Sequence, residues 1–375
     1  MLRSLERPFK RTLTACLGLL FGSRRAAVFA PGISPRILII RQHNQLGDML
    51  CVVPLLRALR EQYPSSFIAL MASPVNYEVM MGNAYIDELI RFDKRDFLGK
   101  KGGNILRFPG FIQRIRSRHF DIAAVPSTVS TSFTSDLIAY LSGARIRIGA
   151  GRLDGKDNPT SFFFTHRREM DWRQLSGYHQ VQRNIDIWPG PLPQTENGTL
   201  EITLKKDELE EGKSFVDKVK MGFARVIVYH PGAGKPPNKW PSERFAALAD
   251  MMSTEMKAAT IVTAGPMDDK PVREMLHVAG VHYHLLRNQP IRKIASILHY
   301  CDLLVSNDTG MMHVGAAAGC PVLSLFGPTD PEQWAPLGTR HRYIRGEGGD
   351  ISAISLESVA QCAREILRSS DDQKR

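Results

Sequence analysis

The regular part of the chain begins with RILIIRQHNQLGDML at residues 36–50. Residues 37–40 form an apolar run of strand length, and apolar residues then recur at helical spacing at positions 50, 53, 56 and 59, before Pro64. A second apolar run follows at residues 67–72. This strand-helix-strand order predicts a parallel sheet with right-handed crossovers, which is the first unit of a doubly wound α/β domain.

A second series of alternating elements occupies the C-terminal part of the chain. Strands are expected at residues 226–229, 260–264, 282–286, 302–306 and 322–326, with helices between them. The helix expected at residues 309–318 should end at Gly319, because glycine readily adopts the left-handed cap conformation. A last helix is expected at residues 356–368, with Ser355 as its N-cap.

Two domains are expected because 375 residues exceed the size of a single hydrophobic core. We place a leader at residues 1–35, an N-terminal α/β domain at residues 36–220 and a C-terminal α/β domain at residues 221–375. The boundary near Met221 follows a charged helical pattern. Residues 151–198 are rich in Pro, Arg and aromatics, and we expect loops and irregular elements there.

The formal net charge is +11, and much of the excess lies in the leader. Residues 1–36 contain seven Lys or Arg and one Glu, so the folded body is only mildly basic. It shows neither a nucleic-acid-binding module nor a basic stripe, which disfavours a nucleic-acid partner. An apolar stretch at residues 13–21 is too short to span a membrane. We interpret it as an interfacial amphipathic segment, with a signal peptide and a flexible leader as alternatives.

The five cysteines are scattered and show neither metal-ligand nor redox spacing. This pattern indicates reduced thiols and fits a cytoplasmic protein.

The first motif reads HNQLGD at residues 43–48, between the first strand and the following helix. Ligands bind at this end of the strands in open α/β sheets. Gly47 permits a tight turn and close approach to a ligand, and Asp48 places a carboxylate at the helix start. In the structural alternative, Asp48 only caps the helix.

The second motif reads HPGAG at residues 230–234 and is followed by KWP at residues 239–241. Small residues such as Gly232 leave backbone N–H groups free to point at an anion, and Lys239 supplies a positive charge for phosphate. The Gly-Lys-Ser/Thr ending of a Walker sequence is missing, which disfavours a nucleoside triphosphatase. In the structural alternative, Lys239 is solvated and Trp240 fills the core.

The third motif reads SNDTGMMH at residues 306–313, with FGPTD at residues 326–330. An apolar strand ends here and a helix begins at once, so N–H groups of residues 309–311 converge at the positive end of a helix. A diphosphate suits such a site. Asp308 either caps the helix or binds sugar hydroxyls. His313 is a secondary candidate, with a buried structural histidine as the alternative.

Taken together, the Leu-Gly-Asp turn, the His-Pro-Gly loop with Lys-Trp-Pro, and the Asn-Asp-Thr-Gly helix start with Phe-Gly-Pro-Thr-Asp resemble glycosyltransferase family 9, the bacterial heptosyltransferases. The motifs occur in the family's order between Arg36 and about Gly338. The resemblance implies the GT-B architecture, in which two doubly wound, Rossmann-like domains face a central cleft. It also implies an inverting, metal-independent transfer without a cofactor, from an ADP-heptose-like donor in the C-terminal half to a lipopolysaccharide inner-core acceptor in the N-terminal half.

The resemblance also assigns roles to individual residues. Asp48 corresponds to the catalytic base and Lys239 to the phosphate-binding lysine. The expected contacts to the donor sugar and diphosphate are Asp308, Thr309 and Gly310. The ribose or base of the nucleotide is expected near Gly265 and Pro266, with Asp268 as a weaker candidate. Gly232 and His313, identified above from their own motifs, complete the expected donor site. No metal site is expected, because the sequence contains no Asp-x-Asp pair to hold a divalent ion.

Two alternatives remain at the level of function. An enzyme of the same fold could use another nucleotide-hexose donor, and a catalytically silent module could bind the nucleotide without transfer. The expected location is cytoplasmic, with peripheral attachment to the inner face of the inner membrane as a hypothesis. The sequence does not predict the oligomeric state.

Overall fold

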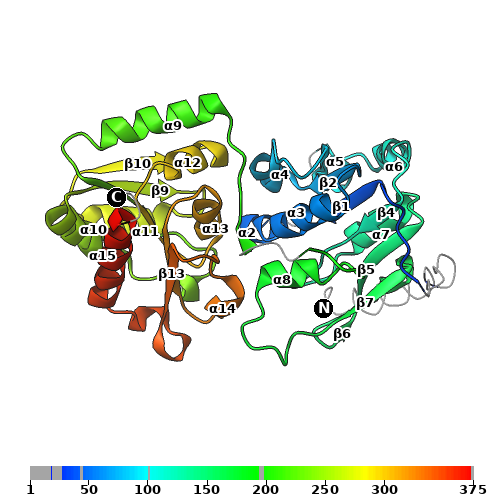
Figure 1. The fold of residues 1–375 in the computed structure, drawn as a ribbon. Coiled ribbons are helices and arrows are strands. Elements are labelled where there is room, and N and C mark those ends of the chain that lie inside the picture. The colour runs from blue at the N-terminus through cyan, green and yellow to red at the C-terminus, as the bar shows by residue number, and fades with distance from the viewer. Residues whose placement is uncertain (1–17, 19–27, 43–44, 100–101, 194–197, 373–375) are drawn as a thin grey trace. The chain divides into compact units, whose positions relative to one another are not determined.

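A computed structural model of the protein describes residues 18, 28–42, 45–99, 102–193 and 198–372 (Figure 1). The chain forms two compact units. The first contains Met1–Asn44, Val52–Tyr77 and Asn83–Thr195, and the second contains Gln45–Cys51, Glu78–Gly82 and Glu196–Arg375. Most of the leader, and His43 and Asn44 of the first motif, lie outside the described residues. In the described part of the chain, no helix is both long and apolar enough to cross a membrane.

The first unit is built on a sheet that has seven strands among its described residues. The strand order is β3-β2-β1-β4-β5-β6, and β7 pairs with β5. The strands are β1 (Ile37–Arg41), β2 (Ile68–Ala72), β3 (Glu88–Arg91), β4 (Ile122–Ala124), β5 (Ile146–Leu153), β6 (Lys156–Asp157) and β7 (His166–Met170). Only the short β5–β6 pair is antiparallel among the described pairs. The order reverses between β1 and β4, which makes the sheet doubly wound, as expected.

Helices cover both faces of this sheet. The helices described around it are α3 (Val53–Gln62), α4 (Pro74–Met80), α5 (Arg95–Leu98), α6 (Phe108–Arg116), α7 (Phe133–Leu141) and α8 (Gln180–Ile185), with 3-10 turns η1 (Ile105–Arg107) and η2 (Ser161–Phe163). Residues 78–80, at the end of α4, belong to the second unit. Every residue of β1 and β2 is buried, as in central parallel strands that are covered on both sides. On one face, Leu38 and Ile40 pack with Phe111 of α6 and Ile138 of α7.

The first helix expected from the sequence is in fact two helices, α2 (Leu46–Leu50) and α3, separated at Cys51 and Val52. Pro54 has no N–H to donate to the carbonyl of Leu50, so a single helix cannot continue through this point. The break also separates the units: α2 belongs to the second unit and α3 to the first. Asp48 is therefore part of the second unit, although the sequence assigned it to the N-terminal domain.

The second unit is built on a sheet of six parallel strands, counted over its described residues, in the order β10-β9-β8-β11-β12-β13. The strands are β8 (Arg225–His230), β9 (Ala258–Ala264), β10 (Tyr283–Arg287), β11 (Leu303–Asn307), β12 (Val322–Phe326) and β13 (His341–Arg345). The helices are α9 (Lys206–Val219), α10 (Ser242–Met256), α11 (Asp269–Val278), α12 (Ile291–Leu298), α13 (Gly310–Ala317), α14 (Pro331–Trp334) and α15 (Leu356–Asp372). The 3-10 turns are η4 (Pro236–Asn238), η5 (Glu347–Gly349) and η6 (Ile351–Ala353).

Helices α10, α11 and α15 pack on one face of this sheet in a core that includes Tyr229, Val262 and Val305. Helices α12 and α13 cover the opposite face (Figure 1). Helix α9 packs against α12 so closely that a Cβ at Gly212 would come within 2.4 Å of the carbonyl oxygen of Ser296. The division between the units accordingly falls at Thr195 and Glu196, before α9, whereas the sequence placed it near Met221.

The periodic patterns of the second half predicted its elements well. Each expected strand is present, and β12 has the expected bounds. Gly319 has a φ of +83°, as expected for the residue that ends α13. Residues 151–198 are more regular than expected, because they include β6, β7 and α8. Strand β7 escaped the sequence analysis because His166, Arg167 and Arg168 give it no apolar alternation, although it pairs with β5 along its length.

Candidate functional site

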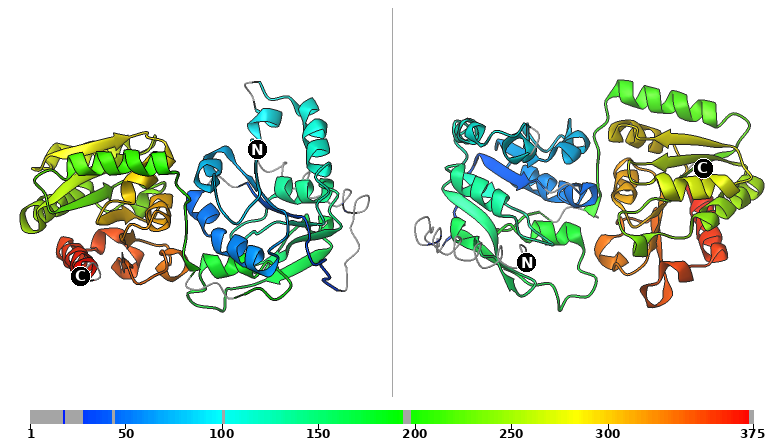
Figure 2. Two further views of the ribbon diagram at one scale, coloured as in Figure 1. Left: turned by 45° about the horizontal axis from the view of Figure 1, so that its top comes forward. Right: turned by 180° about the vertical axis from the view of Figure 1, so that it is seen from behind.

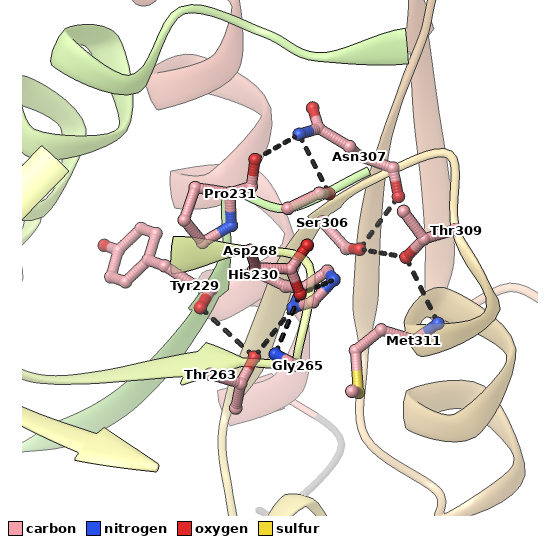
Figure 3. Close-up of polar contacts among 11 residues, drawn as sticks. Tyr229, His230, Pro231, Thr263, Gly265, Asp268, Ser306, Asn307, Thr309 and Met311 are labelled. Carbon is pink, nitrogen blue, oxygen red and sulfur yellow. Dashed lines mark hydrogen bonds and ion pairs between the residues drawn. The ribbon is translucent and has the colours of Figure 1, made fainter. Parts of the chain in front are cut away.

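The candidate donor site lies at the carboxyl edge of the second sheet. The strand order reverses between β8 and β11, and ligands of open α/β sheets bind at such a switch point. The loops after β8, β9 and β11 carry Gly232, Gly265 and Asp308, three of the residues expected from the sequence. Figure 3 shows how the side chains at these strand ends contact one another.

Asp268 holds the loops after β8 and β9 together (Figure 3). Its Oδ2 accepts from the backbone N of Gly265 at 2.8 Å and lies 3.9 Å from Nε2 of His230. A Cβ at Gly232 would come within 2.2 Å of the Asp268 carboxylate, so only glycine permits this packing. The geometry gives Asp268 an organising role in the loop beside Gly265.

His230 is a buried member of the same contact. Its Nδ1 lies 3.0 Å from Oγ1 of Thr263 on β9. Burial lowers the pKa of His230, and the charge of Asp268 opposes that shift. The burial favours a neutral imidazole that joins two strand ends rather than a phosphate-binding cation.

Asn307, at the end of β11, fixes the loop after β8 across the switch point. Its Nδ2 donates to the carbonyl oxygens of Pro231 at 2.9 Å and Gly232 at 3.3 Å. Its Oδ1 accepts from the backbone N of Trp240 at 3.1 Å. A buried amide with these partners holds the loop in one conformation. The sequence analysis assigned no role to Asn307, although a polar residue at the end of an apolar strand is a signal for one.

The next residues place Lys239 and Trp240. Trp240 is 1% exposed, and its Nε1 donates to the carbonyl of Ile354 at 2.9 Å, so it is the core residue of the structural alternative. Lys239 is partly buried and lies between Asn238 and Trp240, both of which are hydrogen-bonded to residues at the end of β11. The chain therefore holds the Lys239 backbone at the edge of the candidate site.

Asp308 does not cap α13. Its Oδ2 accepts from Nδ2 of Asn238 at 2.8 Å, and the same nitrogen lies 3.4 Å from Oγ1 of Thr329. Burial raises the pKa of Asp308 above its usual value, and the hydrogen bond with Thr329 opposes that shift. Asn238 was missed by the sequence analysis, because it follows two prolines in a turn that matches no motif.

Thr309 is the N-cap of α13. Its Oγ1 accepts from the backbone N of Met311 at 3.2 Å and lies 3.4 Å from Oγ of Ser306 (Figure 3). Ser306 Oγ donates to the carbonyl of Asn307 at 2.8 Å. These contacts fix the first turn of the helix at the carboxyl end of β11, where a helix N-terminus attracts anions.

Two glycines bring α2 against the start of α13 within the second unit. A Cβ at Gly47 would come within 2.5 Å of Cδ2 of His313, and a Cβ at Gly310 would come within 3.0 Å of Cβ of Leu46. Asp48 is 3% exposed and His313 is 2% exposed. Gln45, not Asp48, is the N-cap of α2. The helix that carries Asp48, the expected base, and the helix start expected to bind phosphate are thus packed together.

The first unit has a cavity of its own, of ≈ 480 Å³. It lies where the loops after β1, β2 and β3 meet the start of α7, at the carboxyl edge of the sheet. Its lining includes Gln42, Ser73, Phe92, Asp93, Lys94, Arg95, Leu98, Ser132 and Thr134. Arg95 donates to the Asp93 carboxylate at 2.8 Å, which orients the loop after β3. The sequence analysis named no residue of this cavity.

Within the described residues, no group of three or more His, Cys, Asp or Glu is arranged to hold a metal ion.

Comparison with known proteins connects this site to a family. The profile of glycosyltransferase family 9 (heptosyltransferase) matches residues 110–362. The chain belongs to glycosyltransferase family 9. The protein is therefore a glycosyltransferase, as the three sequence motifs indicated.

Individual members of the family resemble the chain to different extents. It is 27% identical over 335 residues to lipooligosaccharide heptosyltransferase 2 of Haemophilus ducreyi, a match that covers 85% of this chain and 91% of that protein. A shorter match, 30% identical over 141 residues, is to lipooligosaccharide heptosyltransferase 2 of Haemophilus influenzae and covers 36% of this chain and 40% of that protein.

Among solved structures, the Escherichia coli ADP-heptose lipopolysaccharide heptosyltransferase II has a TM-score of 0.73 at 22% identity, over 90% of this chain and 99% of that chain. That likeness shows the fold of this family 9 enzyme, which is GT-B.

Proposed function

We propose that this family 9 enzyme transfers heptose from ADP-heptose to the inner core of lipopolysaccharide, with inversion and without a metal ion. The observation that carries the proposal is the packing of α2 on α13, which joins the segment of Asp48 to a helix start that suits a diphosphate. The relatives, which include lipooligosaccharide and ADP-heptose lipopolysaccharide heptosyltransferases, support the same donor and acceptor class. The enzyme would act in the cytoplasm, at the inner face of the inner membrane.

The donor diphosphate would bind at the first turn of α13, near Thr309 and Gly310, with Lys239 as its counter-charge. The developing negative charge on the leaving phosphate is stabilised by such fixed donors, each worth about 3 kcal/mol in the transition state. Asp308, held by Asn238 at 2.8 Å, would accept hydrogen bonds from sugar hydroxyls. The loop at Gly265, fixed by Asp268, would lie near the nucleoside.

Asp48 would act as the general base. It would take the proton of an acceptor hydroxyl while that oxygen attacks the anomeric carbon of the donor sugar. The bond from the anomeric carbon to the diphosphate oxygen breaks, and ADP leaves with the electron pair. Attack from the face opposite the leaving group inverts the anomeric configuration. The low exposure of Asp48 supports this role, because positioning and exclusion of water strengthen a carboxylate base.

The acceptor would bind in the cavity of the first unit. Lys94 and the N-terminal turn of α7, at Ser132 and Thr134, line that cavity and suit an anionic saccharide. Phe92 and Leu98 supply apolar surface for sugar rings. Phosphorylated or acidic sugars of an inner core meet both requirements.

The full chain, purified and supplied with ADP-heptose and a deacylated inner-core acceptor, should form product at a rate that EDTA leaves unchanged. NMR of the product should show the anomeric configuration opposite to that of the donor. A panel of other nucleotide sugars tests the alternative donor. If a hexose is transferred faster than heptose, the donor is that nucleotide-hexose and not ADP-heptose. Loss of activity with EDTA and recovery with magnesium would contradict metal-independent transfer.

A catalytically silent nucleotide-binding module is the second alternative. Asp48 and Lys239 are both present, and α2 packs on α13, which favours a working transferase. Nucleotide-sugar binding without any turnover on acceptor would favour the silent module instead.

A further inference from the structure

An aromatic cluster anchors a surface projection on the first unit. Phe97 of α5 stacks on Phe92 with ring centroids 5.5 Å apart and contacts Phe108 and Phe111 of α6 at 5.4 and 5.6 Å. The backbone N of Asn104 donates to the carbonyl of Asp96 at 2.9 Å, which closes the segment between α5 and η1. Figure 2 (left) shows α5 and the start of α6, in cyan, at the outer edge of their unit. The aromatic rings therefore give the projection a fixed base.

Three large apolar side chains of the projection remain outside this cluster. Leu98 is 63% exposed, Ile105 is 55% exposed and Leu106 is 81% exposed. A single exposed leucine is ordinary, but three in so short a segment, held on a fixed base, form an apolar surface that marks an interaction site. We call these three residues, together with Lys94, Arg107 and Arg114, the α5–η1 rim.

The charges around the apolar residues have one dominant sign. Lys94, Arg107 and Arg114 are exposed, and Arg107 is the N-cap of α6, the helix that carries Arg114. Arg95 is exposed as well but pairs with Asp93. Asp96 is the one exposed carboxylate among described residues 94–116. Apolar side chains surrounded by cationic ones fit the interface of an anionic bilayer. The apolar side chains insert into the bilayer, and the cationic side chains contact the anionic lipid headgroups.

The rim adjoins the candidate acceptor cavity. Leu98 and Lys94 belong to the rim and also line that cavity. We infer that the α5–η1 rim docks on an anionic lipid bilayer, so that a membrane-anchored acceptor can place its saccharide in the cavity while its lipid remains in the membrane. The link between rim and cavity rests on the proposed lipid-linked acceptor, whereas the docking itself can be tested without transfer.

Sedimentation of the full chain with vesicles tests the docking. One set contains phosphatidylglycerol and phosphatidylethanolamine, and the other contains phosphatidylcholine alone. The triple variant Leu98→Ser, Ile105→Ser, Leu106→Ser should bind anionic vesicles at least ~10-fold more weakly than the parent, because it removes the inserting side chains. The leader is identical in both proteins, so its contribution cancels in the comparison.

A matched control uses exposed apolar residues of the second unit. Met221 is 77% exposed and Val278 is 50% exposed. The double variant Met221→Ser, Val278→Ser should bind anionic vesicles as the parent does. Equal binding by the triple variant and the parent, or equal binding of the parent to both vesicle sets, would overturn the inference. A changed oligomeric state of the triple variant with unchanged vesicle binding would assign the rim to a second copy of the chain instead.

A local probe separates the rim from the leader. The variant Leu106→Trp should show a blue shift of its additional tryptophan emission when anionic vesicles are added, since the indole enters the interface. The variant Met221→Trp should show none. Absence of a shift at residue 106 while the protein is vesicle-bound would overturn docking through the rim.

Activity gives an independent measure. The double variant Ile105→Ser, Leu106→Ser, which leaves the cavity-lining Leu98 unchanged, should lose rate on an acceptor embedded in anionic vesicles, yet retain the parental rate on the same saccharide freed of its acyl chains. If neither acceptor reacts with the parent, the proposed function fails, and the vesicle and fluorescence results still decide the docking.

Discussion

Gly47 lies directly against His313: a Cβ at position 47 would come within 2.5 Å of Cδ2 of the imidazole. His313 is 2% exposed and cannot swing away into solvent. This close approach joins α2 to α13 and determines where Asp48, the residue after Gly47, lies relative to Thr309 and Gly310. The candidate base and the candidate diphosphate site are thus parts of one packed arrangement within the second unit.

The variant Gly47→Ala should damage this arrangement. The new methyl group has no space beside His313, and overpacking of this kind typically costs about 1–3 kcal/mol. We expect a lower free energy of unfolding and at least a ~10-fold lower transfer rate, since small displacements of a catalytic group are costly. Chemical denaturation and steady-state kinetics measure both effects.

Two further variants control for a nonspecific effect of the methyl group. A Cβ at Gly234 would meet no atom of the described residues within 4 Å, so Gly234→Ala should change the free energy of unfolding by less than about 0.5 kcal/mol. The double variant Gly47→Ala, His313→Ala should be more stable than expected from the sum of the single changes, because the smaller residue opens space. If the effects of the two substitutions on the free energy of unfolding are simply additive, the contact between residues 47 and 313 is contradicted.

Asn238 should be needed for donor binding because it orients the Asp308 carboxylate from 2.8 Å. Asn238→Ala should raise the KM for the donor about 10-fold, the effect expected when a buried hydrogen-bond partner is lost. Asn238→Asp should be more harmful, since two carboxylates would then be adjacent. An unchanged donor affinity in both variants would remove Asn238 and Asp308 from the site.

Asp136 should make the first unit less stable as the pH rises. The side chain is buried, and burial raises its pKa to about 6, although hydrogen bonds with Thr160 and Asn158 oppose the shift. Between the ordinary carboxyl pKa of 3.8 and about 6, the folded state retains a proton that the unfolded state has lost. Stability that is present below the lower value is therefore lost as the pH rises through the higher one.

The variant Asp136→Asn, whose side chain is neutral at every pH, tests whether the proton on the Asp136 carboxyl group causes this pH dependence. It should flatten the pH dependence of the urea midpoint of the first unit and should be more stable than the parent at pH 8 by up to about 3 kcal/mol. At pH 4 the two proteins should differ little. A parent whose midpoint does not fall between pH 4 and pH 7 would contradict the assignment.

The sequence predicted the elements of this protein better than their membership in the two units. Apolar runs at β8, β9, β11 and β12 identified buried parallel strands, because such strands are covered on both faces. The periodicity of the sequence could not predict to which unit α2 belongs. Its apolar spacing continues into α3, and only the tertiary contacts of Gly47 and Gly310 assign it to the second unit.

The sequence likewise predicted only some residues of the candidate site. Gly232, Thr309 and Gly310 were identifiable from small residues at strand ends and from the helix start. Asn238 carries no such local signal, and its importance comes from reaching Asp308, 70 residues away in the chain. Residues of the acceptor cavity, such as Phe92 and Ser132, come from separate loops, and the chain alone does not bring them together.

The variant Asp48→Asn tests the central claim most directly, because it removes the proposed base while keeping the size of the side chain. Transfer and donor binding should be measured on the same preparation, by product formation and by titration with ADP-heptose. We predict that transfer falls at least ~1,000-fold while the donor dissociation constant stays within a few fold of the parent. Transfer at a near-parental rate would show that Asp48 is not the base and would contradict the account.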